Sequence, residues 1–345
     1  MTTVFVTGGA GYIGSVLVRE LLNEGFRVIC LDRLFFGIDS IKDILSDRNF
    51  VIVHDDVRWF DPIVLRGVDV VIDMAAIAND PAGELNPAWT MAINYEGRVR
   101  VANLAKKHGV KRYILFSSCS VYGFQEHIVN EESKPNPLTT YAKANLMAEQ
   151  GVLPLADEKF TVTVLRLATV YGYSPRTRLD LVVNAMTYTA FREGKIIVEG
   201  DGMQKRPLVH VKDVVRAVKL VMESDPELVN GQIFNVGSNE QNYRIIDIAN
   251  EVRKAIGRDV EIVFRGSPDR RSYWVDFTKI RKVLGFEPKY TVQDGAREIW
   301  RALETGELRP TIRNWTVKTY KYLIETWPEI LDKPLNIIPS YWPEA

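Results

Sequence analysis

Short apolar runs alternate with amphipathic segments through the first 120 residues of the chain. The apolar runs are rich in valine, isoleucine and leucine, and they span residues 3–8, 27–32, 50–57, 69–76 and 112–118. Continuous apolar runs of this length are typical of strands buried on both faces of a parallel sheet. Between them, residues 14–25 and 96–109 follow a helical period. The pattern predicts an open α/β sheet with right-handed crossovers.

Beyond residue 120 the alternation is less regular. Residues 160–172 and 232–238 are predicted as further strands of the same sheet, and residues 245–257 as a clear helix. We expect the last 60 residues to form helices and a tail wrapped on a smaller second lobe; they include Trp300, Trp315, Trp327 and Trp342. The chain is therefore predicted to hold two interleaved units. Residues 1–173 form the first, with a returning strand near 232–238, and residues 174–345 form most of the second.

Charge and cysteine content narrow the classes of partner and compartment. The 345 residues carry 44 basic and 44 acidic side chains, so the formal net charge is zero. That balance gives no electrostatic case for nucleic acid or an acidic membrane surface as a partner. No window approaches the roughly 20 apolar residues of a membrane span. Cys30 and Cys119 are too few for a disulfide framework, so we expect a cytoplasmic protein.

A glycine-rich loop, TGGAGYIGS (7–15), lies between the first predicted strand and the first predicted helix. In this context Gly8 permits a tight turn, Gly11 lets the backbone approach a diphosphate, and Gly14 lets helix and strand pack closely. Asp32 ends the next strand, where a carboxylate accepts hydrogen bonds from an adenosine ribose and repels a 2′-phosphate. The loop therefore predicts a dinucleotide site and favours NAD over NADP, although the adjacent Arg33 points the other way.

Two later strand ends extend the predicted nucleotide site. Asp56 and Val57 stand where one polar and one apolar contact would hold an adenine ring. Ala75 and Ala76 are small residues at a point where the backbone must pass beside the cofactor. Open parallel sheets bind ligands at successive strand ends of this kind.

These motifs, in this order, resemble the extended short-chain dehydrogenase/reductase family, and within it the NAD-dependent nucleotide-sugar epimerases and dehydratases. The resemblance covers about residues 3–285 and is carried by TGGAGYIG, Asp32, DDVR (55–58), AINYEG (92–97), SSCSVYG (117–123), the helix that begins near Tyr141, LRLATVYG (165–172), RPLVHVKDVVRA (206–217) and FNVGS (234–238). It implies a Rossmann-type doubly wound sheet with a smaller, mixed C-terminal substrate lobe. It adds Tyr12, Ile13, Asn94 and Ser117 to the expected NAD contacts, and it implies no metal.

The resemblance assigns a catalytic pair. Tyr141 matches the family's base, whose phenolate takes a proton from a sugar hydroxyl while the carbon loses hydride, and Ser118 matches the hydroxyl that binds the same oxygen. The family's dehydratases carry an Asp-Glu pair just after this serine, whereas this chain has Cys119 and Ser120. The resemblance therefore favours a 4-epimerase that works through a transient 4-keto intermediate.

Asn145 departs from the family pattern, which has lysine four residues after the tyrosine. Asparagine can hydrogen-bond the nicotinamide ribose but carries no charge, and free tyrosine titrates near pH 10. Lys143 cannot substitute, because two residues along a helix is the wrong face. We expect slowed chemistry, with three explanations open: a variant made to trap a complex, a natural enzyme for slow or single-step redox chemistry, or a binding protein that has lost catalysis.

The substrate implied by the resemblance is a nucleoside-diphosphate sugar. Arg206 matches the arginine that meets the diphosphate, Arg271 is a second candidate clamp, and Asn184 is a candidate polar contact. Thr169 stands where many relatives have asparagine. A 4-ketosugar reductase or dehydrogenase, and a non-catalytic NAD and nucleotide-sugar binding protein, remain as alternatives. Helices 90–108 and 141–156 correspond to those that form a homodimer interface in relatives.

Overall fold

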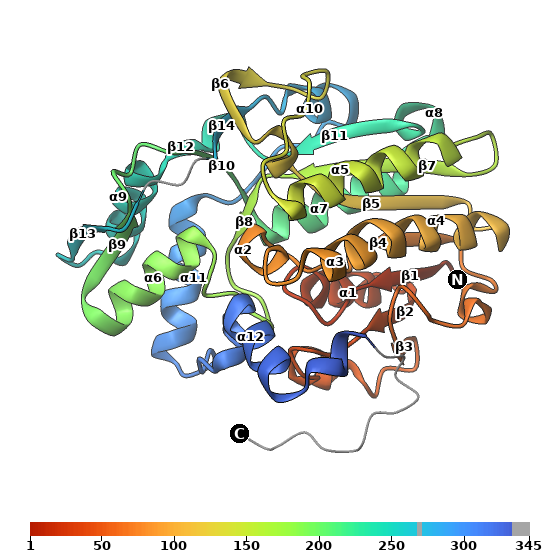
Figure 1. Cartoon of the computed structure of the whole chain (residues 1–345), viewed down its shortest axis with the longest axis horizontal. Coiled ribbons are helices and arrows are strands. Elements are labelled where there is room, and N and C mark those ends of the chain that lie inside the picture. Colours follow the sequence, from red (N-terminus) through yellow and green to blue (C-terminus); the bar gives the residue numbers. More distant parts are fainter. Residues whose placement is uncertain (268–270, 333–345) are drawn as a thin grey trace.

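The computed structural model describes residues 1–267 and 271–332 and contains one large parallel sheet (Figure 1). Its seven strands lie in the order β11-β7-β5-β4-β1-β2-β3, and every pairing is parallel. In chain order the strands are β1 (Thr3–Thr7), β2 (Arg27–Asp32), β3 (Phe50–His54), β4 (Val70–Asp73), β5 (Arg112–Ser118), β7 (Thr161–Leu167) and β11 (Gln232–Val236). The strand order reverses between β1 and β4, where open sheets of this type place their ligand crevice.

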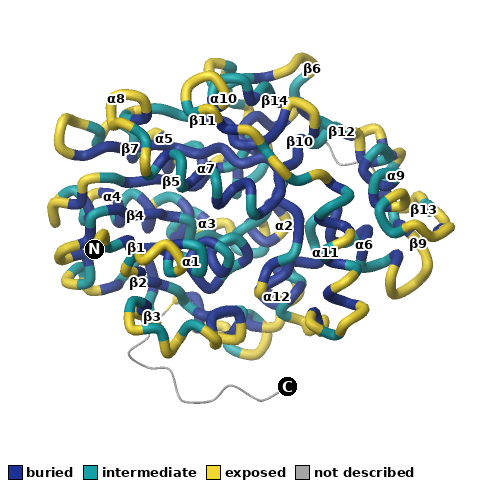
Figure 2. Tube along the Cα trace, turned by 180° about the vertical axis from the view of Figure 1, so that it is seen from behind, coloured by how far each residue is buried: buried dark blue, intermediate teal, exposed yellow. Residues whose placement is uncertain are grey.

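The side chains of alternate residues in each strand point to opposite faces of the sheet. Val4 and Val6 of β1 pack with helices α1 (Gly14–Asn23) and α7 (Val211–Glu223), whereas Phe5 between them packs with α4 (Arg98–Lys107) and α5 (Thr140–Val152). This period of two, with helices on both faces, gives the predicted three-layer, doubly wound arrangement. Figure 2 shows the inner strands of the sheet, such as β1, β4 and β5, as largely buried.

The strand predictions hold for the central sheet, with one correction. The apolar run 160–172 is not a single strand: β7 ends at Leu167, and β8 (Thr169–Tyr171) joins a separate small sheet with β10 (Lys205–His210) and β12 (Asn242–Arg244). The backbone N–H of Ala168, between the two, donates to Val236 on β11. The apolar pattern could not show this break because both halves of the run are buried.

The second lobe is mixed, as predicted. Its core lies between helices α6 (Val182–Glu193), α9 (Ile245–Ile256) and α11 (Val292–Glu304) and the strand pair β9 (Lys195–Glu199) and β13 (Glu261–Arg265). The other elements are β6 (Phe124–Val129) paired with β14 (Ser272–Val275), and the short helices α2 (Asp80–Gly83), α3 (Pro87–Met91), α8 (Pro226–Val229) and α10 (Thr278–Leu284).

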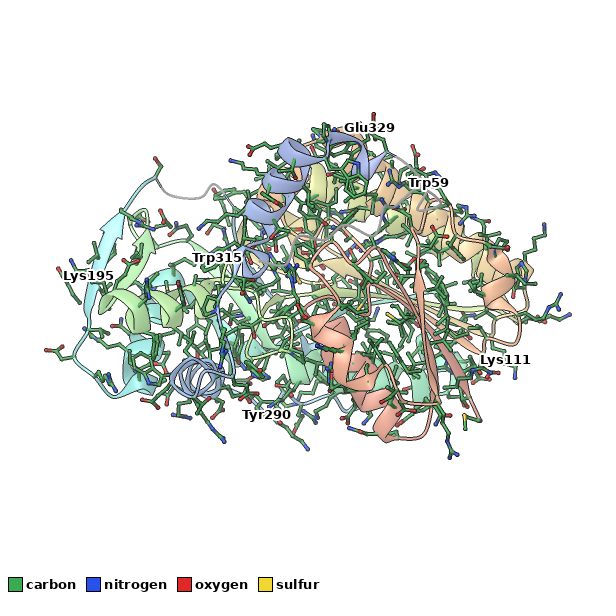
Figure 3. All side chains as sticks on the ribbon, turned by 90° about the horizontal axis from the view of Figure 1, so that it is seen from below. Trp59, Lys111, Lys195, Tyr290, Trp315 and Glu329 are labelled. Carbon is green, nitrogen blue, oxygen red and sulfur yellow. The ribbon has the colours of Figure 1, made fainter. Side chains whose placement is uncertain are left out.

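The C-terminal segment differs from the prediction of a tail on the second lobe. Helix α12 (Thr316–Thr326) buries Tyr320 and Leu323 in the core beneath β1 and β2. The residues after it stay at the same edge, where Arg58 donates to the carbonyl of Leu331 at 2.5 Å; Figure 3 labels Trp59 and Glu329 there. The segment thus closes the nucleotide-binding half. Trp342 lies outside the described residues.

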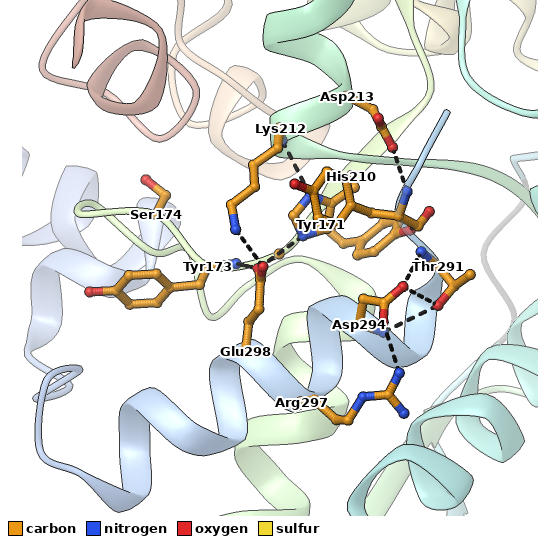
Figure 4. Close-up of polar contacts among 12 residues, drawn as sticks. Tyr171, Tyr173, Ser174, His210, Lys212, Asp213, Thr291, Asp294, Arg297 and Glu298 are labelled. Atoms are coloured by element: carbon orange, nitrogen blue, oxygen red, sulfur yellow. Dashed lines mark hydrogen bonds and ion pairs between the residues drawn. The ribbon is translucent and has the colours of Figure 1, made fainter. Parts of the chain in front are cut away.

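A polar cluster joins the two lobes where β10 meets α7 (Figure 4). His210 is fully buried, its Nδ1 accepts the backbone N–H of Lys212 at 3.2 Å, and its Nε2 lies 3.0 Å from the Glu298 carboxylate on α11. With Nδ1 as an acceptor, Nε2 is the ring nitrogen that donates to the Glu298 carboxylate. Gly172 passes so close that an added Cβ would lie 2.3 Å from the same ring. The cluster fixes the start of the loop that follows β8.

Across residues 1–267 and 271–332, every helix is too short or too polar to cross a membrane. The same residues hold no group of three or more His, Cys, Asp or Glu side chains arranged to bind a metal ion.

Candidate active site

A cavity of about 660 Å³ lies at the carboxyl ends of the strands, between the sheet and the second lobe. It spans the point between β1 and β4 where the strand order reverses. It is lined by most of the residues predicted from the sequence: Gly8, Gly11, Tyr12, Ile13, Gly14, Asp32, Arg33, Asp56, Val57, Ala75, Ala76, Ser117, Ser118, Tyr141, Thr169, Arg206 and Arg271. One continuous site therefore holds both the predicted cofactor end and the predicted substrate end.

The glycine loop forms a cradle in which Gly8 and Gly14 have no room for a side chain. A Cβ on Gly14 would lie 2.2 Å from the carbonyl oxygen of Gly8, and Gly8 itself has φ +74° and sits against the backbone of Ala75. Helix α1 begins at Gly14, which lines the cavity, so the positive end of the helix dipole lies at the cavity wall. These residues fit the diphosphate of a dinucleotide.

The adenosine end of the cavity is defined by Asp32 and Arg33. The Asp32 oxygens accept backbone N–H groups from Ala10 at 2.9 Å and Leu34 at 2.8 Å. Burial raises the pKa of Asp32, and these hydrogen bonds oppose the rise. Arg33 lies 3.7 Å from the carboxylate of Asp56, an ion pair that offsets the positive charge beside Asp32. The pair favours NAD over NADP.

Tyr141 and Ser118 both line the cavity. Tyr141 is the second residue of α5, whose N-cap Thr139 accepts the N–H of Ala142 at 3.1 Å, and Ser118 ends β5. Burial raises the pKa of the Tyr141 phenol; Asp80 adds to the rise, while Arg98, a hydrogen bond with Ser118, and Arg178 oppose it. The two predicted catalytic side chains therefore line one cavity and lie near enough for Ser118 to affect the ionisation of Tyr141.

Three predicted asparagines lie behind the cavity wall. Asn94 exchanges two hydrogen bonds with the backbone of Ile77, and Asn184 binds the backbone of Gly172 and Arg178. Asn145 is 1% exposed; its Oδ1 accepts from Arg98 at 2.7 Å and its Nδ2 donates to the carbonyl of Tyr141 at 2.9 Å. Their amides support the site from inside the protein, and they are absent from the lining described above.

Arg206 and Arg271 come together at the substrate end. The Arg206 guanidinium donates to the backbone carbonyl of Arg271, and the Arg271 guanidinium pairs with Asp80. Thr169 lies on the same cavity wall. Two arginines beside each other suit a diphosphate. Cys119 is buried and donates to the carbonyl of Arg166, so it packs inside the protein.

Several charged residues of the cavity were missed by the sequence analysis. Arg176 and Arg178 follow β8, and Arg178 forms an ion pair with Asp180 at 2.9 Å. Arg176 stacks on Phe36 at 3.6 Å, and burial beside Arg178 lowers its pKa to about 9. Arg98, at the start of α4, lies on the same helix face as three buried apolar residues. That position, an arginine in an apolar stripe, was visible in the sequence.

Comparison with known proteins finds one matching family and several related proteins. A model of the NAD dependent epimerase/dehydratase family matches residues 4–237. The chain is 27% identical over 308 residues to an uncharacterized UDP-glucose epimerase, YtcB, of Bacillus subtilis, covering 85% of this chain and 95% of that protein. It is 31% identical over 307 residues to UDP-glucuronic acid decarboxylase 6 of Arabidopsis thaliana, covering 85% and 86%.

Solved structures show the same fold. MoeE5 in complex with UDP-glucuronic acid and NAD superposes with a TM-score of 0.78 at 25% identity, over 88% of this chain and 99% of that one. The family model covers the glycine loop, both catalytic candidates and the sheet. The chain therefore belongs to the NAD-dependent epimerase/dehydratase family of extended short-chain dehydrogenases/reductases, and it is an enzyme with NAD as its cofactor.

Proposed function

We propose that the protein is an NAD-dependent nucleotide-sugar 4-epimerase. The observation that carries the proposal is that Ser118 and Tyr141 line one continuous cavity together with the glycine cradle and with Arg206 and Arg271. A nucleoside-diphosphate sugar held by its phosphates at the arginines would present its sugar to the phenol.

Different residues of the chain have different roles in the oxidation and the reduction of the sugar. Ser118 hydrogen-bonds the reacting sugar oxygen, and Tyr141 takes its proton as the carbon becomes a ketone. NAD, when bound between the glycine loop and Asp32, supplies the acceptor for the hydride. Arg206 and Arg271 hold the diphosphate while the sugar turns, so the hydride can return to the opposite face. Tyr141 then gives the proton back.

The residues after Ser118 favour epimerisation over dehydration. Elimination of water needs an acid and a base beside the sugar, and this chain has Cys119 and Ser120 there, both buried. Burial raises the pKa of Cys119 far above its ordinary value, so the thiol does not act as an acid–base group at neutral pH.

Turnover of nucleotide sugars tests the proposal directly. NAD-loaded protein is incubated with UDP-glucose, UDP-galactose and UDP-glucuronic acid, and with dTDP-, GDP- and CDP-sugars, and products are resolved by chromatography. Formation of the C4 epimer supports the proposal. Net oxidation of added NADH by a keto sugar would identify a reductase instead. Tight nucleotide-sugar binding by calorimetry, without any product or change in nicotinamide absorbance, would identify a binding protein.

A second candidate, decarboxylation, rests on the 31% identity to a plant UDP-glucuronic acid decarboxylase. Oxidation at C4 of a uronic acid creates a β-keto acid, which loses carbon dioxide readily. The same Ser118 and Tyr141 would then serve a different outcome. Carbon dioxide released from UDP-glucuronic acid, measured with the label in the carboxyl group, separates the two.

We also propose a homodimer through residues 90–108 and 141–156. Here α3, the π-helical segment Ala92–Gly97 and α4 lie against α5. Gly151 on α5 packs so closely that an added Cβ would lie 2.5 Å from Val99. Met147 is 36% exposed, and Tyr95, Val99 and Leu104 are partly exposed on the same pair of helices. Sedimentation at micromolar concentration should give a dimer, and a monomer there would contradict the proposal.

A cytoplasmic location is proposed from the cysteines. Cys30 and Cys119 are both buried as free thiols. Such a protein suits a reducing compartment. Cell fractionation with an antibody against the protein tests this, and recovery outside the cytoplasmic fraction would contradict it.

A further inference from the structure

Arg98 places a guanidinium inside the protein, with only 2% of the residue exposed. Its Nη1 donates to Asn145 Oδ1 at 2.7 Å, and its Nε donates to the carbonyl of Ala75 at 3.1 Å. Asn145 in turn donates from Nδ2 to the carbonyl of Tyr141, one helical turn earlier, at 2.9 Å. A chain of hydrogen bonds therefore links the arginine to the backbone that carries the candidate base.

The charge of this guanidinium is not cancelled by direct contact with an anion. Both of its hydrogen bonds go to neutral oxygens, and no carboxylate of the described residues contacts it. The nearby Asp73 instead accepts hydrogen bonds from the hydroxyls of Thr7 and Tyr113, each at 2.6 Å. A buried cation without a contacting anion is costly, so its retention needs a reason.

The position of Arg98 gives a reason for its retention. Arg98 and Tyr141 line the same cavity, whereas Asn145 lies behind the cavity wall. The positive charge of Arg98 opposes the rise that burial causes in the pKa of Tyr141. Arg178 and Ser118 act in the same direction, whereas Asp80 acts against them. Arg98 thus has the electrostatic effect that the family's lysine has from position 145.

We propose that Arg98 is the positioning residue that supplies the positive charge beside Tyr141, and that Asn145 is its neutral anchor. The inference rests on the function proposed above. It explains why position 145 is not lysine: a second buried cation beside Arg98 would repel the first. In this chain the positive charge beside Tyr141 is therefore on α4, whereas the family's lysine would be on α5.

Four variants test whether Arg98 supplies the charge that lysine would supply from position 145. Arg98→Met removes the positive charge, and Arg98→Lys keeps it. Asn145→Lys adds a second cation, and the double variant Arg98→Met/Asn145→Lys places the single charge at position 145. We expect Arg98→Met to slow hydride transfer about tenfold or more at neutral pH, with recovery at alkaline pH. Arg98→Lys should retain most of the rate. Asn145→Lys alone should give no gain, and the double variant should be faster than Arg98→Met.

Arg100→Met is the matched control, because Arg100 lies on the same helix and donates to the carbonyls of Val57 and Phe60. It should leave the pH profile unchanged. Asn145→Asp is a second test in case Arg98→Met does not fold. The new carboxylate would hold the Arg98 guanidinium in place but cancel its charge. The pH profile of hydride transfer should therefore shift to higher pH.

The ionisation of Tyr141 can also be followed without turnover. The phenolate absorbance of the NAD-loaded protein is titrated against that of Tyr141→Phe, and the difference reports one tyrosine. Under the proposal, Arg98→Met and Asn145→Asp shift this titration upward, even if no nucleotide sugar is converted and the proposed function fails. An unshifted titration in both variants, or faster hydride transfer by Asn145→Lys with Arg98 in place, would overturn the proposal.

Discussion

The Arg271 guanidinium forms an ion pair with the Asp80 carboxylate inside the cavity. Asp80 begins helix α2, and its other oxygen accepts a hydrogen bond from Thr139 at 2.5 Å. The pair joins the nucleotide-binding half to the second lobe at the substrate end. A diphosphate that binds Arg271 must therefore compete with Asp80 for the same guanidinium.

Asp80→Asn should tighten the binding of UDP by about three- to tenfold, because it removes the competing charge and leaves the side chain's shape. Titration calorimetry at fixed ionic strength measures the change. Asp43→Asn is the control, since Asp43 pairs with Arg19 at an exposed site outside the cavity lining. Equal or weaker binding by Asp80→Asn would mean that Arg271 does not meet the phosphates.

Tyr141→Phe should lower the rate of hydride transfer by about 10²- to 10⁴-fold while the protein still retains NAD. Burial raises the pKa of the Tyr141 phenol, so the base form gains population as the pH rises, and the wild-type rate should increase from neutral toward alkaline pH. Ser118→Ala should cost less, because it removes a hydrogen bond and leaves the base. Stopped-flow absorbance at the nicotinamide band provides the rate; a Tyr141→Phe variant with the wild-type profile would exclude this role.

The parts of the site that follow strand ends could be predicted from the sequence. Ser118 and Tyr141 were assigned by the family resemblance, and Tyr141 lies on helix α5 and not at a strand end. The glycine loop and Asp32 lie at the carboxyl ends of parallel strands, which meet at one edge of the sheet. Their spacing along the chain therefore carries their position in space. The seven strands of the central sheet were predictable for another reason, their continuous apolar runs, which are typical of strands buried on both faces.

The direction in which a buried polar side chain points could not be predicted. Asn94, Asn145 and Asn184 were expected to face ligands, yet each amide is satisfied by protein groups behind the cavity wall. A buried amide seeks partners in any direction, and sequence spacing does not say which partner is nearer. Arg98 is different: it stands in the buried stripe of α4 with Val101, Ala102 and Ala105, so the helical period alone marks it as a buried charge.

Gly14→Ala should abolish NAD retention, because the added Cβ would lie 2.2 Å from the carbonyl oxygen of Gly8 and displace the loop from the helix. Gly109→Ala is the matched control. Gly109 also has a positive φ but nothing lies within 4 Å of an added Cβ, so this variant should cost only about 1–2 kcal/mol of stability. Absorbance of nucleotide released from heat-denatured protein measures retention. Full retention by Gly14→Ala would contradict the proposed role of the cradle.

Tyr320→Ala should loosen the cofactor. Tyr320 on α12 lines the cavity, is 4% exposed, and packs edge-on against Phe35 at 6.1 Å and Phe36 at 5.5 Å. Its removal opens the adenosine end to water, so NAD should dissociate about tenfold or more faster in dialysis or competition with labelled NAD. Tyr322→Ala, two residues along and 41% exposed, should retain NAD as the wild type does. Equal release from both variants would show that α12 is only a packing element.

Glu298→Gln should destabilise the junction between the lobes in a pH-dependent way. Burial alone would raise the pKa of Glu298, but the hydrogen bonds from His210 and Lys212 outweigh it and lower the pKa below its usual value of 4.5. A carboxylate with a depressed pKa contributes stability that is present above pH 4.5 and lost as the pH falls through the folded-state pKa.

The variant should therefore be less stable by about 1–2 kcal/mol at pH 7, with the difference shrinking as the solution is acidified. Denaturant unfolding at several pH values measures this. Glu304→Gln, on the same helix with an exposed side chain 3.8 Å from Arg258, should change stability little at any pH. A Glu298→Gln penalty that did not vary with pH would locate the loss in packing, because only the ionised carboxylate responds to acid.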